Sequence, residues 1–320
     1  MPVSSFLRID LDLFPACRAF LEFEAPLTPP PRPLLWLLYL MTVKKKSDIQ
    51  QIHDYRVMHI IGEGAASTIY AVHDPKHKIY ALKHVLLKGS KDARFLEQAE
   101  TEVKISAKLN HPAIRKIHRV HKIRPGLART EVIVVMELID ADALDVLQIP
   151  DLAQRVDVFH QVAEGLAHMY EKGYVHADMK PTNILVDDEM KATIIDLGQA
   201  CKIGSVKARI QGTPGYMAPE QADRKEITPA TDVYNFGATM YWLLTRQEVP
   251  TARPDGGLGG GMKLPPPPHK FDKRVPMKLS ELVMQSINHR PHARFENMRI
   301  VADKLESIKI TPLIESPTAS

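Results

Sequence analysis

The eight-residue polar segment from His176 to Asn183 constrains the fold of this chain more than any other feature. Two short apolar runs follow it, Ile184 to Val186 and Ala192 to Ile195, on either side of an acidic turn. Short β-branched runs around a turn predict a hairpin, which returns the chain to the end where it began. The fold must therefore place this polar segment beside the residues that follow the second run, beginning with Asp196.

The residue types in this region suit phosphoryl transfer. That reaction needs a carboxylate near the attacking hydroxyl, a cation beside the moving phosphoryl group, and oxygen ligands for Mg²⁺. Asp178, Lys180, Asn183 and Asp196 supply these groups in that order. The alternative is a loop with unrelated polar residues. The coincidence of four specific residues with the predicted hairpin favours the phosphoryl-transfer interpretation.

The rest of the chain divides into a strand-rich part and a helix-rich part. Helical patterns occupy 93–109, then Leu152 to Tyr170 before Gly173, and most of the chain beyond about residue 230. Four runs with strand character precede the second of these helices: Tyr55 to Ile61, Thr68 to Val72, Ile79 to Val85, and Val132 to Leu138. Strands followed by helices predict an α+β fold.

A glycine turn, Gly62-Glu63-Gly64-Ala65-Ala66-Ser67, lies between the first two predicted strands. Glycine allows a tight turn whose backbone N–H groups can face phosphates. Because Thr68 to Val72 reads as a strand and not as a helix, the pattern disfavours a dinucleotide fold. A plain hairpin remains the alternative.

Lys83 lies in an apolar strand, where a charge is costly to bury without an anionic partner. It is either an edge-strand lysine that reaches water or a ligand of ATP phosphates positioned by a glutamate. Glu97, Glu100 and Glu102 of the following helix are candidates for that glutamate, and we favour Glu102.

The stretch from about Tyr55 to Leu305 resembles a protein kinase catalytic domain, and in particular the eukaryotic-type Ser/Thr kinases of bacteria. The resemblance implies a bilobal protein-kinase-like fold, with a β-rich N-lobe (55–139) that holds one main helix and a helical C-lobe (140–308). It also implies ATP between the lobes, Mg²⁺ or in its place Mn²⁺, and protein substrates with Ser or Thr acceptors.

The same resemblance implies roles for individual residues. Asp178 would be the catalytic base, Lys180 would steady the transferring phosphoryl group, and Lys83 would pair with Glu102. Asn183 and Asp196 would hold the metal ion. Met136 resembles the gatekeeper before a hinge at 137–139, and Ala81 and Leu185 would enclose adenine. The implied nucleotide-binding set is Ile61, Gly62, Glu63, Gly64, Ser67, Ile69, Ala81, Lys83, Met136, Glu137, Ile139 and Leu185.

Downstream motifs also fit the resemblance. The segment Gly212 to Glu220 resembles the end of an activation segment, and Glu220 would pair with Arg294. Asp232 would brace the segment that carries Asp178. In the family, these motifs position the peptide substrate, and they distinguish protein kinases from kinases of small molecules.

Three residues depart from the family pattern. Ala177 stands where many members have an arginine that pairs with a phosphorylated activation loop. We therefore expect no strict need for phosphorylation of that loop. Leu197 replaces a phenylalanine, and Ser67 replaces the third glycine of the turn. None of these changes removes a group needed for phosphoryl transfer.

Composition limits the classes of partner and the cellular location that the chain can have. The excess of Lys and Arg (42) over Asp and Glu (38) is too small to indicate nucleic-acid binding. Cys17 and Cys201 are the two cysteines, too few for a disulfide framework or a four-thiolate zinc site, which favours a cytoplasmic location.

The ends of the chain differ from its middle. Residues 26–33 are proline-rich, and the apolar run from Leu34 to Val43 is shorter than the roughly 20 residues of a membrane-spanning helix. We expect residues 1–50 to be disordered or, through a start at Met41, partly untranslated. Peripheral membrane association through 34–46 is the alternative. Residues 251–268 read as a loop and 309–320 as a disordered tail.

Two other function classes stay open. An ATP-binding pseudokinase scaffold is disfavoured because Lys83, Asp178, Asn183 and Asp196 are all present. A small-molecule phosphotransferase is disfavoured by Ala218-Pro219-Glu220 and by the motif around Asp232.

Overall fold

The computed structural model describes residues 49–64, 67–87, 93–123, 130–250 and 264–310, all within one unit that spans 47–320. The apolar run Leu34 to Val43, almost all of the predicted N-terminal segment and residues 311–320 of the predicted tail lie outside these residues. The predicted loop at 251–268 is described only from residue 264 onward. Within the described part of the chain, no helix is long and apolar enough to cross a membrane.

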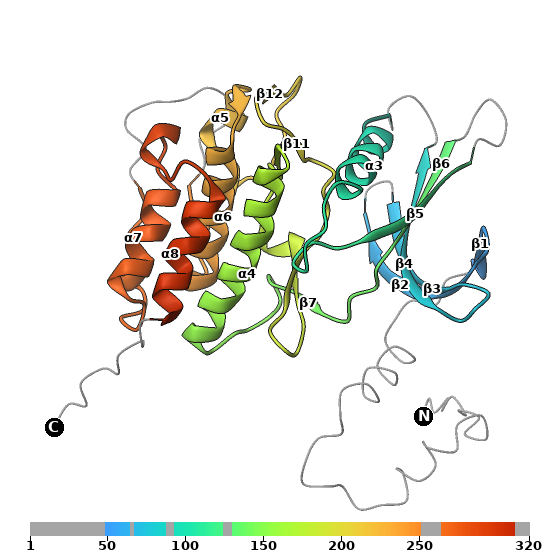
Figure 1. Ribbon diagram of the computed structural model, residues 1–320, viewed down its shortest axis with the longest axis horizontal. Coiled ribbons are helices and arrows are strands. Elements are labelled where there is room, and N and C mark those ends of the chain that lie inside the picture. The colour runs from blue at the N-terminus through green and yellow to red at the C-terminus, as the bar shows by residue number, and fades with distance from the viewer. Residues whose placement is uncertain (1–48, 65–66, 88–92, 124–129, 251–263, 311–320) are drawn as a thin grey trace, which may run out of the picture. The chain divides into compact units, whose positions relative to one another are not determined.

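The first part of the chain forms a six-stranded antiparallel sheet, seen in Figure 1, with the order β1-β2-β3-β4-β6-β5. Strand β6 is buried almost completely, which agrees with its continuous apolar sequence. The strands are β1 (Gln51–Ile52), β2 (Tyr55–Glu63), β3 (Ser67–His73), β4 (Ile79–Leu87), β5 (Ile117–Ile123) and β6 (Thr130–Met136). Four of these strands were predicted, whereas β1 and β5 were not.

One helix, α3 (Ala93–Ser106), packs on this sheet. Its apolar face meets Val85, Val132 and Val134 around the buried Ala99. The helix ends before the predicted boundary at 109. Its last turn tightens, because the amide of Lys108 bonds to Ile105 three residues back.

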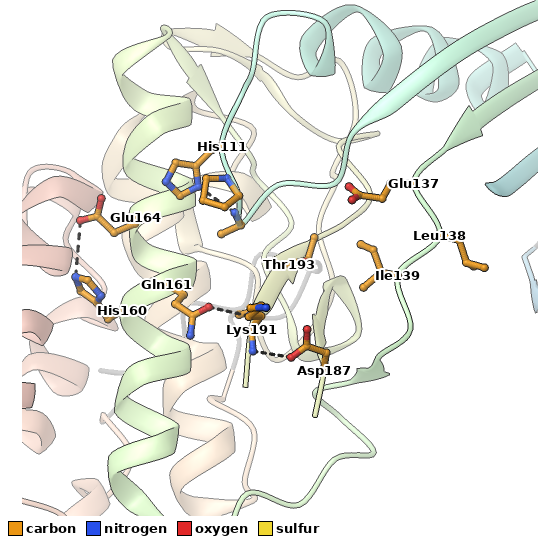
Figure 2. A pocket seen from close by; sticks show the side chains of 13 residues that line it. His111, Glu137, Leu138, Ile139, His160, Gln161, Glu164, Asp187, Lys191 and Thr193 are labelled. Atoms are coloured by element: carbon orange, nitrogen blue, oxygen red, sulfur yellow. Dashed lines mark hydrogen bonds and ion pairs between the residues drawn. The ribbon is translucent and has the colours of Figure 1, made fainter. Parts of the chain in front are cut away.

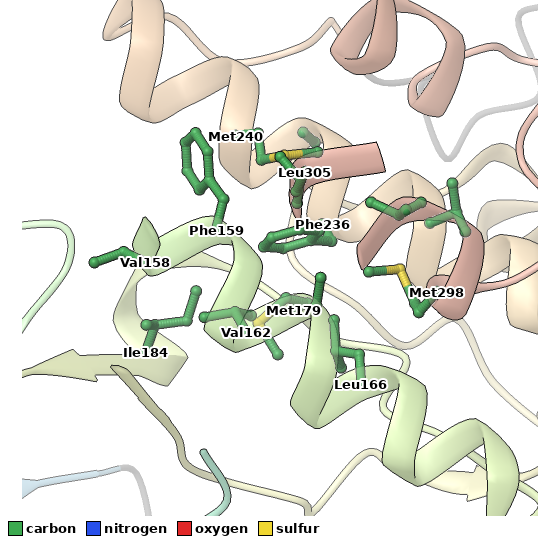
Figure 3. Close-up of a cluster of buried hydrophobic side chains, with 14 of the residues drawn as sticks. Val158, Phe159, Val162, Leu166, Met179, Ile184, Phe236, Met240, Met298 and Leu305 are labelled. Atoms are coloured by element: carbon green, nitrogen blue, oxygen red, sulfur yellow. The ribbon is translucent and has the colours of Figure 1, made fainter. Parts of the chain in front are cut away.

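The later part of the chain is mainly helical. Its core centres on α4, which presents apolar residues at helical spacing, and Phe159 packs edge-to-face on Phe236 with ring centroids 6.1 Å apart (Figure 3). The helices are α4 (Leu152–Glu171), α5 (Pro219–Ala222), α6 (Pro229–Thr245), α7 (Met277–Ser286) and α8 (Met298–Ile310). Three short 3₁₀ turns accompany them: η3 (Pro181–Asn183), η4 (Pro268–Lys270) and η5 (Pro291–Ala293).

The ends of α4 follow from its sequence. The Asp151 side chain caps the first turn by accepting a 2.9 Å bond from the Ala153 amide. The chain leaves the helix at Gly173, whose φ of 82° lies in the left-handed region that glycine adopts most easily. The C-terminus of α8 is Ile310, so the last helix extends beyond the predicted lobe boundary at 308.

Small strands complete the region around the polar segment. The predicted hairpin is β9 and β10, and it places the Ile195 amide 2.9 Å from the Asn183 carbonyl oxygen. The short strands are β7 (Asp142–Ala143), β8 (Tyr174–Val175), β9 (Ile184–Val186), β10 (Ala192–Ile194), β11 (Cys201–Lys202), β12 (Ser205–Val206) and β13 (Glu226–Ile227). The predicted α+β class, with a β-rich lobe followed by a helical lobe, is confirmed.

Candidate active site

Lys83 and Glu102 meet where β4 faces α3. The distance from Lys83 Nζ to Glu102 Oε2 is 2.8 Å, and the Glu102 side chain is only 3% exposed. Glu102 lies on the buried face of α3 with Ala99, three residues earlier, whereas Glu100 is exposed and pairs with Lys122 instead. Of the three candidate glutamates, the structure therefore brings Glu102 to the lysine.

Asp196 lies at the end of the hairpin, 3.9 Å from Lys83 (Oδ1 to Nζ), and accepts a hydrogen bond from the Gly198 amide. Partial burial raises the pKa of Asp196, but Lys83 and that amide outweigh this effect and hold the pKa below its ordinary value. Burial likewise lowers the pKa of Lys83, while Glu102 and then Asp196 raise it above its ordinary value. The two groups keep each other charged.

Asp178 and Lys180 are joined through a threonine that the sequence analysis did not single out. Thr213 Oγ1 donates to Asp178 Oδ1 at 2.9 Å and accepts from Lys180 Nζ at 2.9 Å. Lys180 Nζ also lies 3.4 Å from Asp178 Oδ2. The carboxylate and the ammonium group therefore face the same small space with fixed orientations.

Asn183 is oriented by its own loop. Its Nδ2 donates to the Asp178 carbonyl oxygen at 2.8 Å, so its Oδ1 is the atom suited to a cation. Two oxygen ligands, from Asn183 and Asp196, are few for an all-protein metal cage. They match Mg²⁺, which is commonly held by one or two side chains together with substrate phosphates. Among the described residues, no cluster of three His, Cys, Asp or Glu side chains could hold a metal ion.

Asp232 holds the backbone of the polar segment at His176 and Ala177. Its carboxylate is buried and accepts the amides of His176 and Ala177, both at 2.8 Å. Burial raises the pKa of Asp232, although His176 and these two amides oppose the shift. Ala177 has a φ of 62°, in the left-handed region that costs a non-glycine residue energy. The two amide bonds to Asp232 stabilise this backbone conformation.

A cavity of about 260 Å³ connects these groups. It is lined by Ser67 of the glycine-turn hairpin, by residues of α3, and by Lys83, Asp178, Lys180 and Asp196. Four of the residues predicted to act on phosphates or the metal ion, Lys83, Asp178, Lys180 and Asp196, therefore line one cavity, whereas Asn183 is not part of its lining. In the β2–β3 hairpin that carries Ser67, Gly62 pairs with Ile69. The Gly64 amide donates a 2.7 Å hydrogen bond to the Ser67 carbonyl oxygen.

The predicted adenine-side residues come from two sheets. Ala81 is opposite Met136 in the β4–β6 register, and both are buried. Leu185 lies in β9 and is partly exposed. The backbone amide of Glu137 donates to the Lys116 carbonyl. The backbone carbonyl of Glu137 is therefore the group suited to contact the adenine base of a nucleotide.

Side chains of the predicted hinge, including Glu137 and Ile139, line a second cavity of about 490 Å³. Figure 2 shows this cavity between the hinge, α4 and the β9–β10 turn, with Gln161 and Lys191 beside it. It does not contain Lys83, Asp178 or Asp196. The side chains of the predicted hinge therefore line a cavity that is separate from the one lined by Lys83, Asp178 and Asp196.

The predicted pair of Glu220 with Arg294 is present and buried. Arg294 Nη1 and Nη2 bond to the two carboxylate oxygens at 2.7 and 2.9 Å, and Thr231 donates to the same carboxylate at 3.0 Å. The guanidinium also lies over the Tyr234 ring, 4.8 Å from its centroid. This arrangement fixes the segment that ends at α5.

Sequence reasoning missed Gln221 as well as Thr213. Gln221 Nε2 donates to the Ala177 carbonyl at 2.7 Å and to the Gln211 carbonyl at 3.2 Å, and its Oε1 accepts from Asn235 at 2.8 Å. In the sequence, Gln221 stands between Glu220 and the stretch Ala222-Asp223-Arg224-Lys225, and nothing in that context signalled such contacts. The position of Thr213 inside the Gly212-Thr213-Pro214 motif could have been a signal.

Comparisons with known proteins agree with this geometry. A family described as the protein kinase domain matches residues 55–304. The serine/threonine-protein kinase PknA of Mycobacterium tuberculosis is 29% identical over 270 residues, which cover 80% of this chain and 61% of that protein.

Two further relatives are also bacterial. The serine/threonine-protein kinase PknD of Chlamydia pneumoniae is 26% identical over 293 residues, covering 79% of this chain and 31% of that protein. A probable serine/threonine-protein kinase of Clostridium acetobutylicum is 25% identical over 268 residues, covering 80% of this chain and 40% of that protein. The chain thus spans less than two thirds of the length of each of these relatives.

Proposed function

Because the chain belongs to the protein kinase family, we propose that it transfers the γ-phosphoryl group of ATP to serine or threonine hydroxyls of proteins. The observation that carries this proposal is the contact of Thr213 with both Asp178 and Lys180 at the cavity that Lys83 and Asp196 also line. A base, two cations and a metal-binding carboxylate then face one another.

Asp178 accepts the proton of the acceptor hydroxyl, because its carboxylate is fixed beside Lys180 and points into the cavity. Lys180 offsets the charge on the transferring phosphoryl group. Lys83, held by Glu102, binds the phosphates of the nucleotide from the opposite wall. Mg²⁺ held by Asn183 and Asp196 would neutralise charge on those phosphates, and Mn²⁺ would fit the same oxygen ligands.

The nucleotide base would lie between Ala81 and Leu185 against the hinge that follows Met136. Ala81 supplies a small buried contact in β4, and Leu185 comes from the hairpin that also presents Asn183 and Asp196. The hairpin thus links the base site to the metal ligands in one rigid element. The glycine turn between Ile61 and Ser67 would cover the phosphates, with Glu63 and Ile69 beside it.

The activation segment would work without a phosphate on its loop. Ala177 offers no cation for such a phosphate; it lies in an apolar cluster with Val175 and Ile227, against which Cys201 packs. Backbone pairing of β11 with β8 and of β12 with β13 supports the segment instead. Gln221 adds a direct bond to the Ala177 carbonyl.

Protein acceptors are favoured over small molecules by the buried Glu220–Arg294 pair, which stabilises the segment after Thr213. A cytoplasmic location is part of the proposal, and its support is the low cysteine content of the sequence.

The test is incubation of the purified chain with radiolabelled ATP, Mg²⁺ and a generic protein substrate, followed by phosphoamino-acid analysis. We expect label on serine and threonine. The control is Asp303→Asn, an exposed change on α8 that should retain transfer. A folded chain that binds Mg-ATP without transferring phosphate would favour the scaffold function. Faster transfer to sugars or antibiotics than to any protein would favour a small-molecule kinase.

A further inference from the structure

Arg115 lies on the chain between α3 and β5, where the sheet lobe meets the hairpin that carries Asp196. The Arg115 amide donates to the Ile194 carbonyl at 3.0 Å, and the Ile194 amide donates to the Ala113 carbonyl at 2.8 Å. A parallel bridge between Ile114 and Ile194 completes this contact. The backbone of Arg115 is therefore fixed to β10, two residues before Asp196.

The side chain of Arg115 reaches Glu102 of α3. Its Nη2 is 3.6 Å from Glu102 Oε1, and the Arg115 side chain is only 10% exposed. The other carboxylate oxygen of Glu102 holds Lys83. Each oxygen of Glu102 thus has a cation of its own, one from the sheet and one from the segment fixed to the hairpin.

The four charged groups balance one another. Lys83 and Arg115 contribute two positive charges, and Glu102 and Asp196 contribute two negative charges. Burial lowers the pKa of Arg115, while Glu102 and Asp196 oppose that shift. Because arginine stays protonated in proteins, this buried charge requires the carboxylates in every state of the protein. An outward movement of α3 would leave the guanidinium without its nearest carboxylate.

The apolar attachment of α3 to the sheet is modest. Among the α3 residues whose burial is described, Ala99 is buried in the cluster on the sheet, and the partly buried Phe95, Leu96 and Val103 pack against that cluster. Ile105, also buried, belongs to the core of the helical part. A helix with a small buried face can shift on its sheet more easily than one with a large buried face. The buried ionic contact of Arg115 with Glu102 therefore adds to this apolar packing in setting the position of α3.

We propose that Arg115 is a positioning residue, which holds α3 where Glu102 reaches Lys83 and couples that helix to the strand carrying Asp196. The inference rests on the proposed kinase function, since its consequence is the geometry of Lys83 and Asp196 around the nucleotide. Arg115 itself takes no part in the chemistry. It makes the ion pair of Lys83 with Glu102 persist without a signal from the activation segment.

The test compares Arg115→Met, which removes the guanidinium and keeps an unbranched apolar stem, with Arg115→Lys, which keeps the charge. The matched control is Lys122→Met. Lys122 also joins β5 to α3, through Glu100, at 2.6 Å, but that pair is exposed. Steady-state kinetics with varied ATP and amide hydrogen exchange over α3 are measured for each variant, with the folded fraction set by thermal unfolding.

We expect Arg115→Met to lower kcat by about tenfold to a hundredfold, because a small displacement of positioning groups costs that much. The KM for ATP should change far less, and amides of α3 should exchange faster than those of α4. Arg115→Lys should recover part of the lost kcat. Lys122→Met should leave kcat and exchange near the wild-type values, because exposed pairs contribute little.

A wild-type kcat and wild-type α3 exchange in Arg115→Met would overturn the inference. So would a loss of kcat that only follows the folded fraction and that Arg115→Lys does not relieve. If Arg115→Met does not fold, Arg115→Gln carries the same expectations, and Arg115→Lys should show intermediate α3 exchange. A wild-type chain without any transfer would refute the proposed function instead, and α3 exchange would still decide whether Arg115 positions the helix.

Discussion

Thr213 donates a 2.9 Å hydrogen bond to Asp178, and this contact joins the segment Gly212 to Glu220 to the polar segment His176 to Asn183. The same hydroxyl accepts from Lys180, so a single oxygen atom orients the proposed base and its neighbouring cation. The two residues are 35 positions apart in sequence. The position of the segment that carries Thr213 therefore bears directly on the orientation of Asp178 and Lys180.

Thr213→Val should lower kcat by about tenfold or more, because it removes the hydroxyl and lets Asp178 and Lys180 leave their productive orientation. Thr213→Ser keeps the hydroxyl and should remain close to wild type. Steady-state kinetics on a protein substrate provide the measurement. Equal activity of the valine and serine variants would show that the contact has no catalytic consequence.

Breaking the buried Glu220–Arg294 pair should destabilise the protein strongly. Glu220→Gln leaves the Arg294 guanidinium buried without its carboxylate, and such changes cost about 3–5 kcal/mol. The free energy of unfolding from urea denaturation measures this loss. The control is Asp223→Asn, which breaks the exposed pair with Lys225 and should lower the free energy of unfolding far less. Similar losses in both variants would contradict the assigned difference in burial.

Asp196 should make stability depend on pH in the acidic range. Its pKa in the folded protein is below the ordinary value, so its contribution is present above about pH 4 and is lost as the pH falls through the folded-state pKa. Asp196→Asn should therefore be less stable than wild type at pH 7, and the difference should shrink toward pH 3.5. Urea denaturation without nucleotide or metal tests this. A difference that grows on acidification would reverse the sign of the effect.

Phosphatase treatment should change the activity of the chain little. Ala177 has no positive charge that could pair with a phosphate on the loop. The strand pairs β11–β8 and β12–β13 hold the segment by backbone hydrogen bonds instead. Activity is measured before and after dephosphorylation, with removal of phosphate verified by mass spectrometry. A large loss would mean that another basic group reads a phosphate, with Ser205 or Thr213 as the site to examine.

The sequence predicted the hairpin well because a hairpin depends on local pattern. Turn residues between two short apolar runs determine how Asn183 and Asp196 meet. Glu102 was favoured among three glutamates for its position ten residues before Pro112. In the fold it shares a helix face with the buried Ala99. Periodicity was thus informative wherever one face of an element is buried.

Other features depend on contacts between distant segments. Strand β5 was missed because Ile117–Ile123 mixes histidine, arginine and lysine with apolar residues and lies at the sheet edge. Arg115 gave no signal because its partners, Glu102 and Ile194, come from other elements. Residues that link elements have no period in the sequence, so only the folded arrangement identifies them.

The most direct test of the account compares phosphate transfer and ATP binding in wild type and Asp178→Asn. The substitution removes the proposed base and leaves Lys83, Asn183 and Asp196 in place. We predict transfer to serine and threonine by wild type, a loss of kcat of at least about a hundredfold in the variant, and nearly equal affinity for Mg-ATP. Retention of transfer by Asp178→Asn would contradict the assignment of Asp178 as the base.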